Sequence, residues 1–247
     1  MILYPTIELQ NGRCVSLNRG RLDEPSVWHV DPVETARGFA AAGAQWMQVT
    51  DFDAIVGEET SSATVEDIIR GAGIPVQVAG GIRTREHAEE WLNKGAGRVV
   101  IGTMATRDPQ TVKSLAKFYP DQIVLAVDVW QGQVMSEGWK SSSAFEPEAF
   151  IQEFDGVPFA GILVTDIDAD VEDNDASLSL VTTLAAASRT PIVASGIVRT
   201  TDDIARLKYV SNVGGALVSR SLFRKTIDLA EALEVAQPSA DKVAEFI

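Results

Sequence analysis

Residues 49–54 read VTDFDA, and residues 164–169 read VTDIDA. Each follows an apolar run, so each marks the end of a predicted strand and the start of the loop after it. Further matches occur in the same order in both halves, at an offset of roughly 116–120 residues. They pair 7–12 with 127–132, 75–84 with 191–200, and 102–103 with 219–220. Four ordered matches predict an internal duplication.

Short apolar runs alternate with amphipathic stretches along the whole chain. The runs are rich in Val and Ile and mostly lack polar alternation, which is typical of strands covered on both faces in a parallel sheet. We expect strands at 2–8, 45–50, 75–79, 98–102, 122–128, 161–165, 191–195 and 216–219.

Helices are expected between these strands. Asp31-Pro32 and Asp108-Pro109 each place a capping residue before a proline at the first helical position. The expected helices cover 31–42, 84–94, 108–118, 146–154, 177–188, 200–209 and 226–236. Strict alternation predicts an α/β fold, a TIM (β/α)8 barrel, with a doubly wound open sheet as the alternative.

The duplication divides this barrel into two (βα)4 half-barrels. We expect one barrel domain over residues 1–247, with half-barrels at about 1–120 and 121–236 and a C-terminal tail at 237–247. An approximate two-fold axis along the barrel then places matching features of the halves on opposite sides of its mouth.

Composition limits the functions to consider. The chain has 247 residues, 35 acidic and 21 basic, with a formal net charge of −14, which argues against nucleic-acid or anionic-membrane partners. One cysteine and two histidines are a poor basis for a disulfide, a metal site or a Ser-His-Asp triad. No apolar run reaches the length of a membrane span. We therefore expect a cytoplasmic protein without a metal or cofactor, and favour a monomer.

Two carboxylic acids occupy matching positions at the predicted mouth. Glu8 and Asp128 end the first and fifth predicted strands. Two carboxyl groups on opposite sides of a substrate can act as general acid and general base if their surroundings separate their pKa values. The alternative is that both are exposed or cap loops.

Turns rich in glycine and hydroxyl residues also recur in both halves. Such turns expose backbone N–H groups that bind phosphate, although tight βα turns need glycine in any case. Two sites on opposite rims imply an elongated ligand with a phosphate at each end. The candidates are Gly80, Gly81, Arg83, Gly102 and Thr103 in the first half, and Ser195, Gly196, Ser219 and Arg220 in the second.

Other residues near the strand ends have an interpretation in binding and a structural one. Thr165 either contacts the substrate or caps its strand. Trp139 either stacks on a planar heterocycle or packs on the rim, and Arg19 either meets a phosphate or stays solvated. The aspartates of the repeated motif (Asp51, Asp53, Asp166, Asp168) either function or cap loops.

These motifs resemble one known family. The pieces MILYPTIELQNG (1–12), DPVETARGFAAAGAQWMQVTDFDA (31–54), GGIR (80–83), VIGT (100–103), AVD (126–128), GW (138–139), TDID (165–168) and ASG (194–196) are similar to those of the phosphoribosylformimino-aminoimidazole carboxamide ribotide isomerases of histidine biosynthesis. The resemblance spans about residues 1–236. It extends to the sister cyclase, but GW after the fifth strand and the spacing favour the isomerase.

The resemblance implies a cofactor-free Amadori rearrangement of an aminoaldose to an aminoketose on a bis-phosphorylated ribotide. It implies that Asp128 is the general acid, that the acid at position 8 is the base, and that Thr165 assists. Gly81, Gly102 and Thr103 then hold one phosphate, with Gly196, Ser219 and Arg220 near the other.

Several residues depart from the pattern of that family. Glu8 replaces Asp, and Ser16 replaces an Arg at the end of the first hairpin. Ile197 and Ser219 replace glycines, and Val171 also replaces a glycine, before an acidic run at 172–175. A β-branched residue disfavours positive φ, so Ile197 is expected to obstruct the second phosphate site.

These departures leave other functions open. The leading hypothesis is a ribotide isomerase or an isomerase of a related phosphosugar. A non-catalytic paralogue that binds a phosphorylated metabolite or a partner is the second hypothesis, and a cyclase-like enzyme is the third.

Overall fold

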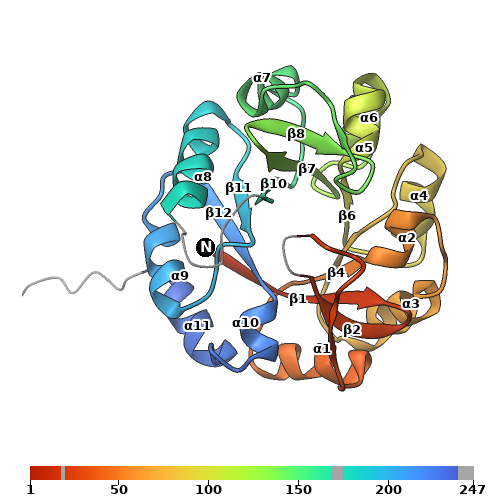
Figure 1. Cartoon of the computed structure of the whole chain (residues 1–247), viewed down its shortest axis with the longest axis vertical. Coiled ribbons are helices and arrows are strands. Elements are labelled where there is room, and N and C mark those ends of the chain that lie inside the picture. The colour runs from red at the N-terminus through yellow and green to blue at the C-terminus, as the bar shows by residue number, and fades with distance from the viewer. Residues whose placement is uncertain (18–19, 168–174, 239–247) are drawn as a thin grey trace, which may run out of the picture.

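Strand β1 (Ile2–Gln10) pairs in parallel with β12 (Val213–Val218), and this pairing closes a sheet into a barrel. The computed structural model describes residues 1–17, 20–167 and 175–238. The barrel strands follow one another as β1–β4–β5–β6–β7–β10–β11–β12, all parallel (Figure 1). Its remaining strands are β4 (Met47–Asp51), β5 (Val76–Ala79), β6 (Arg98–Ile101), β7 (Ile123–Trp130), β10 (Gly161–Asp166) and β11 (Ile192–Ser195). The predicted TIM (β/α)8 barrel is confirmed, and the open sheet is wrong.

Helices surround the barrel on the outside (Figure 1). The longer ones are α1 (Pro32–Ala41), α3 (Ser62–Gly71), α4 (Arg85–Asn93), α6 (Pro109–Phe118), α7 (Pro147–Glu153), α8 (Asp175–Ala187), α9 (Thr201–Lys208) and α11 (Leu229–Ala236). The predicted caps hold: Asp31 and Asp108 accept hydrogen bonds from backbone N–H groups of α1 and α6, and proline begins both helices. In the described part of the chain, no helix is both long and apolar enough to cross a membrane.

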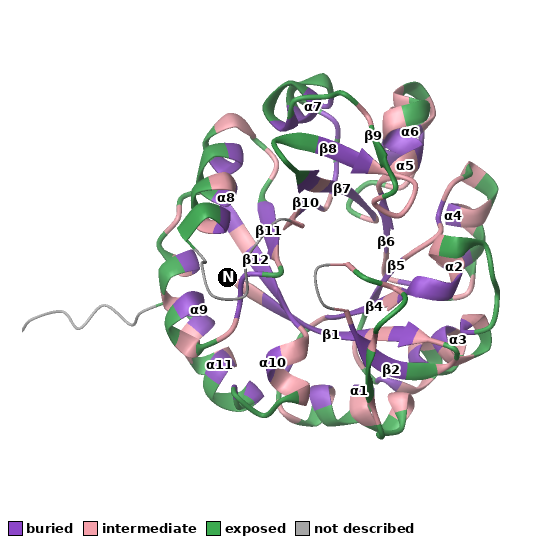
Figure 2. Cartoon of the chain, in the orientation of Figure 1, coloured by how far each residue is buried: buried purple, intermediate pink, exposed green. Residues whose placement is uncertain are grey.

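Apolar side chains form two layers. The larger core lies between the strands and the helices, whose outer faces are exposed (Figure 2). A smaller cluster fills the barrel interior and consists of Tyr4, Ala79, Val100, Val124, Ala126, Leu163, Val193 and Leu217. The interior is therefore packed, which leaves the carboxyl ends of the strands as the place for a cavity.

The two halves share unusual backbone conformations at the matched positions. The first hairpin turns at Asn11 and Gly12 with φ of 52° and 68°, and the later one at Gln131 and Gly132 with φ of 49° and 74°. Positive φ at both central residues is the signature of a tight hairpin turn of type I′. These paired conformations agree with the duplication found in the sequence.

Several elements lay outside the predicted set. Helix α3 was not among the predicted ranges, although strict alternation calls for a helix between the second and third barrel strands. Strands β2 (Arg13–Ser16), β3 (Ser26–Trp28), β8 (Gln133–Ser136) and β9 (Ser141–Ser142), and the short helices α2 (Phe52–Val56), α5 (Thr103–Arg107) and α10 (Arg220–Phe223), were also not expected. Glu8 and Asp128 do not end their strands: β1 and β7 each continue for two residues into a hairpin.

Candidate active site

A cavity of about 520 Å³ lies at the carboxyl ends of the barrel strands. Every predicted site residue that the structure describes lines it. These are Glu8, Gly80, Gly81, Arg83, Gly102, Thr103, Asp128, Trp139, Thr165, Ser195, Gly196, Ser219 and Arg220. Arg19 lies outside the described residues, although Leu17 and Gly20 on either side of that gap also line the cavity. The spacing of the motifs in the sequence thus brings them to one place.

Glu8 and Asp128 reach this cavity from opposite sides of the barrel. Glu8 is on β1 and Asp128 on β7, with three strands between them in either direction around the ring. Both side chains line the same cavity. A ligand in the cavity is therefore flanked by two carboxyl groups.

The pKa of Glu8 is raised to about 7, because the carboxyl is withdrawn from water. The nearby hydroxyls of Ser219 and Ser16 and the positive charge of Arg220 all lower this pKa and so oppose the effect of burial. Ser16 is buried and its hydroxyl oxygen accepts a 3.0 Å hydrogen bond from Trp28 Nε1. A carboxyl with a pKa near neutrality can take up and release a proton at physiological pH.

Asp128 has a defined set of partners on its own side of the barrel. Trp139 Nε1 donates a 2.8 Å hydrogen bond to its Oδ2, and Thr165 lies beside it in the β7–β10 register. Burial raises the pKa of Asp128, while the hydrogen bonds to Trp139 and Thr165 lower it. Because Trp139 also packs against Gly20, it lies on the rim and contacts the acid at the same time.

The Gly80-Gly81 turn is packed closely against the neighbouring βα unit. Both residues have positive φ, and a Cβ on Gly81 would lie 2.4 Å from the carbonyl oxygen of Ala54. Arg83 Nη1 lies 3.4 Å from the same oxygen, and its Nη2 donates to the carbonyl of Ile55. The Arg83 guanidinium therefore contacts α2, and it also lines the cavity, as does Arg220, whose Nη2 donates to the carbonyl of Leu17.

The turn at Gly102-Thr103 connects to the loop after β8. The Thr103 hydroxyl oxygen accepts a 2.9 Å hydrogen bond from the backbone N–H of Glu137, and Glu137 forms an ion pair with Arg107. These contacts fix the loop that carries Trp139. The turn at Gly102-Thr103 and the loop of Trp139, which hydrogen-bonds to Asp128, thus form one continuous wall of the cavity.

The second-half turn is not obstructed by Ile197. Gly196 has a φ of 80° and lines the cavity, whereas Ile197 is 2% exposed and packs in the core between barrel and helices. Glycine thus occupies the position with positive φ, and the β-branched residue follows it. The expectation that Ile197 blocks the second phosphate site is wrong.

Ser219 also fits a position where the related family has glycine. Its φ and ψ are −119° and −94°, close to the −113° and −82° of Gly102 in the first half. A negative φ does not require glycine. The Ser219 hydroxyl oxygen is buried without a hydrogen bond of good geometry among the described residues, but it is near enough to lower the pKa of Glu8.

Two arginines in the cavity wall were missed as site residues. Arg199 follows β11 and Arg224 follows α10, and both line the cavity with Arg220. Arg199 matches Arg83 in the internal repeat, a signal that was available in the sequence. Arg224 is four residues after Arg220, and only the fold shows that both face the cavity.

The aspartates of the repeated motif have structural partners. Asp51 caps α2, and burial raises its pKa to about 6. Asp53 accepts hydrogen bonds from Asn11 N and the Ser61 hydroxyl, so it joins α2 to the first hairpin, and both first-half aspartates are buried with structural partners. Asp166 accepts a hydrogen bond from Ser177.

The acidic run lies largely beyond what the structure describes. Asp168, Val171 and residues 172–174 are outside the described residues. Asp175 is described, and it pairs with Arg206 of α9 at 2.6 Å. No group of three or more His, Cys, Asp or Glu side chains in the described part of the chain could hold a metal ion.

Comparison with known proteins shows which family this sequence matches. The sequence model of the family described as "Histidine biosynthesis protein" matches residues 2–228, which covers the barrel and both carboxyl groups. The chain belongs to this family. The resemblance noted in the sequence is thereby confirmed.

Similar members of the family carry one name. Two are 1-(5-phosphoribosyl)-5-((5-phosphoribosylamino)methylideneamino)imidazole-4-carboxamide isomerases 1 and 2, from a Ruegeria species and Ruegeria pomeroyi. They are 61% identical over 247 residues and 62% identical over 246 residues, and each match covers 100% of both chains. The isomerase of that name from Caulobacter vibrioides is 40% identical over 236 residues, 94% of this chain and 98% of the relative.

Proposed function

We propose that this chain is an isomerase of histidine biosynthesis that acts on the compound named in its relatives. That compound carries two phosphoribosyl groups, one of them attached through an amino nitrogen. The reaction turns this aminoaldose into the corresponding aminoketose. The observation that carries the proposal is a single cavity with carboxyl groups on two opposite strands, in a chain 61% identical to such an isomerase over its whole length.

Asp128 acts as the general acid in the first step. It donates a proton to the ribose ring oxygen while the C1–O bond breaks and the amino nitrogen forms a double bond to C1. The product is an open-chain Schiff base. Trp139 and Thr165 orient the carboxyl group for this step, and burial supports it because a raised pKa keeps more of the acid protonated.

Glu8 acts as the general base in the second step. It takes the proton from C2, and the electrons of that C–H bond form a C1–C2 double bond as the Schiff base becomes an enolamine. Tautomerisation returns a proton to C1 and removes one from the C2 hydroxyl, which leaves a ketone. The pKa of about 7 for Glu8 suits a group that accepts a proton near neutral pH.

The two ends of the substrate are assigned to the two halves of the barrel. In the first half, backbone N–H groups of the turns and the Thr103 hydroxyl face one phosphate. In the second half, Arg220 and the turns at Ser195, Gly196 and Ser219 face the other. The proposed ligands are Gly80, Gly81, Gly102, Thr103, Ser195, Gly196, Ser219 and Arg220, and Arg19 remains a candidate outside the described residues.

The remaining expectations belong to the same proposal. A cytoplasmic monomer that binds a bis-phosphorylated small molecule, and neither nucleic acid nor membrane, fits a chain with a net charge of −14 and a single cysteine. The non-catalytic alternative is disfavoured, because the second phosphate turn on which it rested is not obstructed.

Turnover and binding of the bis-phosphorylated compound test the function together. Wild-type protein is expected to turn it over, and Asp128→Asn to lose on the order of 10²–10⁴-fold in kcat while calorimetry still detects binding. Asp67→Asn, on the exposed face of α3, is the matched control and keeps full activity. Binding without turnover in the wild type would instead support the non-catalytic paralogue.

A further inference from the structure

Three arginines of the second half share one wall of the cavity. Arg199 comes from the turn after β11, and Arg220 and Arg224 come from the first residue and the C-cap of α10. We propose that Arg199 and Arg224 are substrate-positioning residues that, with Arg220, bind a phosphate monoester through their guanidinium groups. This inference rests on the proposed function, because it concerns one end of the same substrate.

Arg220 and Arg224 are close enough to affect each other. They are four residues apart on one helical turn, the spacing at which side chains become neighbours. The pKa of Arg220 is lowered by burial and by the charge of Arg224, while Glu8 opposes this effect. Two neighbouring cations that face a cavity repel each other until an anion lies between them. A phosphate dianion satisfies both, because guanidinium groups form paired, charge-assisted hydrogen bonds with it.

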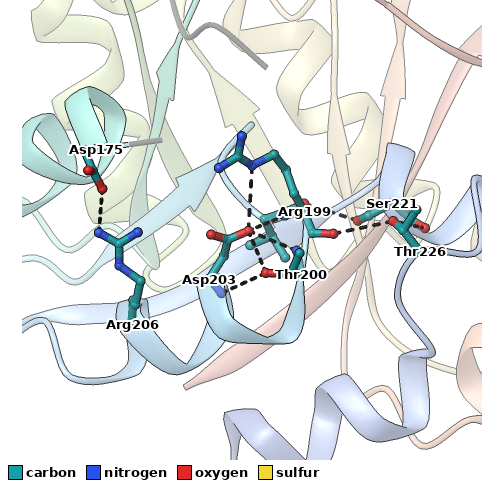
Figure 3. A network of polar contacts seen from close by, with 8 residues as sticks. Asp175, Arg199, Thr200, Asp203, Arg206, Ser221 and Thr226 are labelled. Atoms are coloured by element: carbon teal, nitrogen blue, oxygen red, sulfur yellow. Dashed lines mark hydrogen bonds and ion pairs between the residues drawn. The ribbon is translucent and has the colours of Figure 1, made fainter. Parts of the chain in front are cut away.

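The backbone that carries Arg199 is held from two directions (Figure 3). Asp203 Oδ2 accepts hydrogen bonds of 2.9 Å from the backbone N–H groups of both Arg199 and Thr200, and it lies 3.9 Å from Arg199 Nε. From the other side, the Thr226 hydroxyl donates to the Arg199 carbonyl at 3.4 Å. Ser221, on α10, donates to the carbonyl of Val198 at 3.2 Å. The turn of β11 and the helix that carries Arg220 therefore form one unit.

Among its described residues, the first half of the barrel has no equivalent cluster. Arg83 is the one arginine or lysine that lines the cavity among the described residues 1–120, and its guanidinium contacts the carbonyls of Ala54 and Ile55. That side offers backbone N–H groups and the Thr103 hydroxyl instead. In the described part of the chain, the two ends of the cavity therefore differ in chemistry, and the arginines gather in the half where Ile197 and Ser219 stand in place of glycines.

If Arg199 and Arg224 bind the phosphate and take no part in proton transfer, their replacement should affect KM more than kcat. Replacement of Arg199 or Arg224 by Met keeps much of the side-chain length and removes the charge. KM for the bis-phosphorylated compound is expected to rise on the order of tenfold or more, while kcat changes less than about threefold. KM should also become less sensitive to added KCl, because fewer charged contacts remain to be screened.

A second measurement does not depend on turnover. Inorganic phosphate is titrated calorimetrically into wild type and into the Arg199→Met/Arg224→Met double variant, with Arg70→Met/Arg189→Met, both on the exposed surface, as the charge-matched control. We expect phosphate to bind the double variant at least tenfold more weakly than the wild type or the control. Arg224→Lys should recover part of the affinity, and thermal unfolding verifies that each variant is folded.

The two measurements separate the two proposals. Phosphate binding that weakens in the double variant, in a wild type without turnover, would support the arginine site and overturn the proposed function. Normal turnover with unchanged KM, salt dependence and phosphate affinity in the double variant would overturn the arginine site alone.

Discussion

The indole nitrogen of Trp139 donates a 2.8 Å hydrogen bond to Oδ2 of Asp128. One end of this bond is in the loop after β8, and the other is on the fifth strand of the barrel. The bond stabilises the ionised carboxylate and opposes the effect of burial on its pKa. The position and the protonation of the proposed acid therefore both depend on one loop residue.

Trp139→Phe tests this dependence, because it keeps an aromatic ring and removes the N–H. We expect the pKa of Asp128 to rise further, which moves the alkaline limb of the kcat profile to higher pH. We also expect kcat to fall on the order of tenfold, because the acid is less well oriented. Trp130→Phe, at the exposed end of β7, is the matched control. An unchanged pH profile in Trp139→Phe would contradict this role.

Gly20 packs against the ring of Trp139 and offers a second way to disturb the acid. A Cβ at Gly20 would lie 2.4 Å from Trp139 Cε3, and its φ of 68° is unfavourable for alanine. Gly20→Ala should therefore lower kcat, and it should also destabilise the fold by about 1 kcal/mol. Gly132→Ala is the control, because Gly132 has a φ of 74° with nothing within 4 Å of a Cβ. In urea unfolding, Gly20→Ala should lose at least as much stability as Gly132→Ala, because of the added contact with the ring, and only Gly20→Ala should lose activity. Equal activities would show that the contact is unimportant.

Glu8→Gln should abolish activity and at the same time raise the free energy of unfolding above pH 7. The folded pKa of Glu8 is raised from 4.5 to about 7, so the folded state holds an extra proton between these values. The free energy of unfolding then decreases as pH rises through this window, and the loss is complete above pH 7. Gln carries no ionisable proton, so Glu8→Gln should be more stable than wild type at pH 8 by about 1–3 kcal/mol, and equal at pH 4.

Urea unfolding at both pH values measures this effect. Activity should be lost in Glu8→Gln at every pH, because the base is gone. Glu86→Gln, exposed in the first turn of α4, should show no pH-dependent gain. A Glu8→Gln protein less stable than wild type at pH 8 would argue that Glu8 is held mainly by favourable contacts.

Glu8→Asp tests whether the longer acid is adapted to its site. The Ser16 and Ser219 hydroxyls both act on the Glu8 carboxyl, and Trp28 holds Ser16 at 3.0 Å. Removal of one methylene withdraws the carboxyl by roughly 1.5 Å. We expect kcat to fall on the order of 10²-fold, because a displacement near 1 Å can cost that much. A faster Glu8→Asp enzyme would show instead that Glu8 is a poor substitute for the shorter acid.

Much of the barrel was predictable because its signals are local. Apolar runs identify the strands. Asp31 and Asp108 mark the starts of α1 and α6, because each is a capping residue followed by proline. The internal repeat adds long-range information, since it predicts that Glu8 and Asp128 lie on opposing strands. Helix α3 has neither the Asp-Pro start of α1 and α6 nor a match in the internal repeat, and it was not among the predicted ranges.

The details of the site depend on contacts between distant segments. Ile197 was misjudged because the sequence does not show that Gly196 takes the positive φ alone. The contacts of Arg83 could not be predicted, because its partners, Ala54 and Ile55, are on the preceding βα unit. Arg224 was missed because its approach to the cavity depends on how α10 packs beside the turn after β11.

Glu8 stands at the join between the first and last strands of the barrel. Strand β1 carries it, and β12, which pairs with β1, leads directly into Ser219 and Arg220. Burial is the main cause of the raised pKa of Glu8, and Ser219 and Arg220 moderate it, so the proton affinity of this acid depends on β12 lying beside β1. The surroundings of the proposed base are thus contributed by both ends of the chain, and they are complete only when the first and last strands are joined.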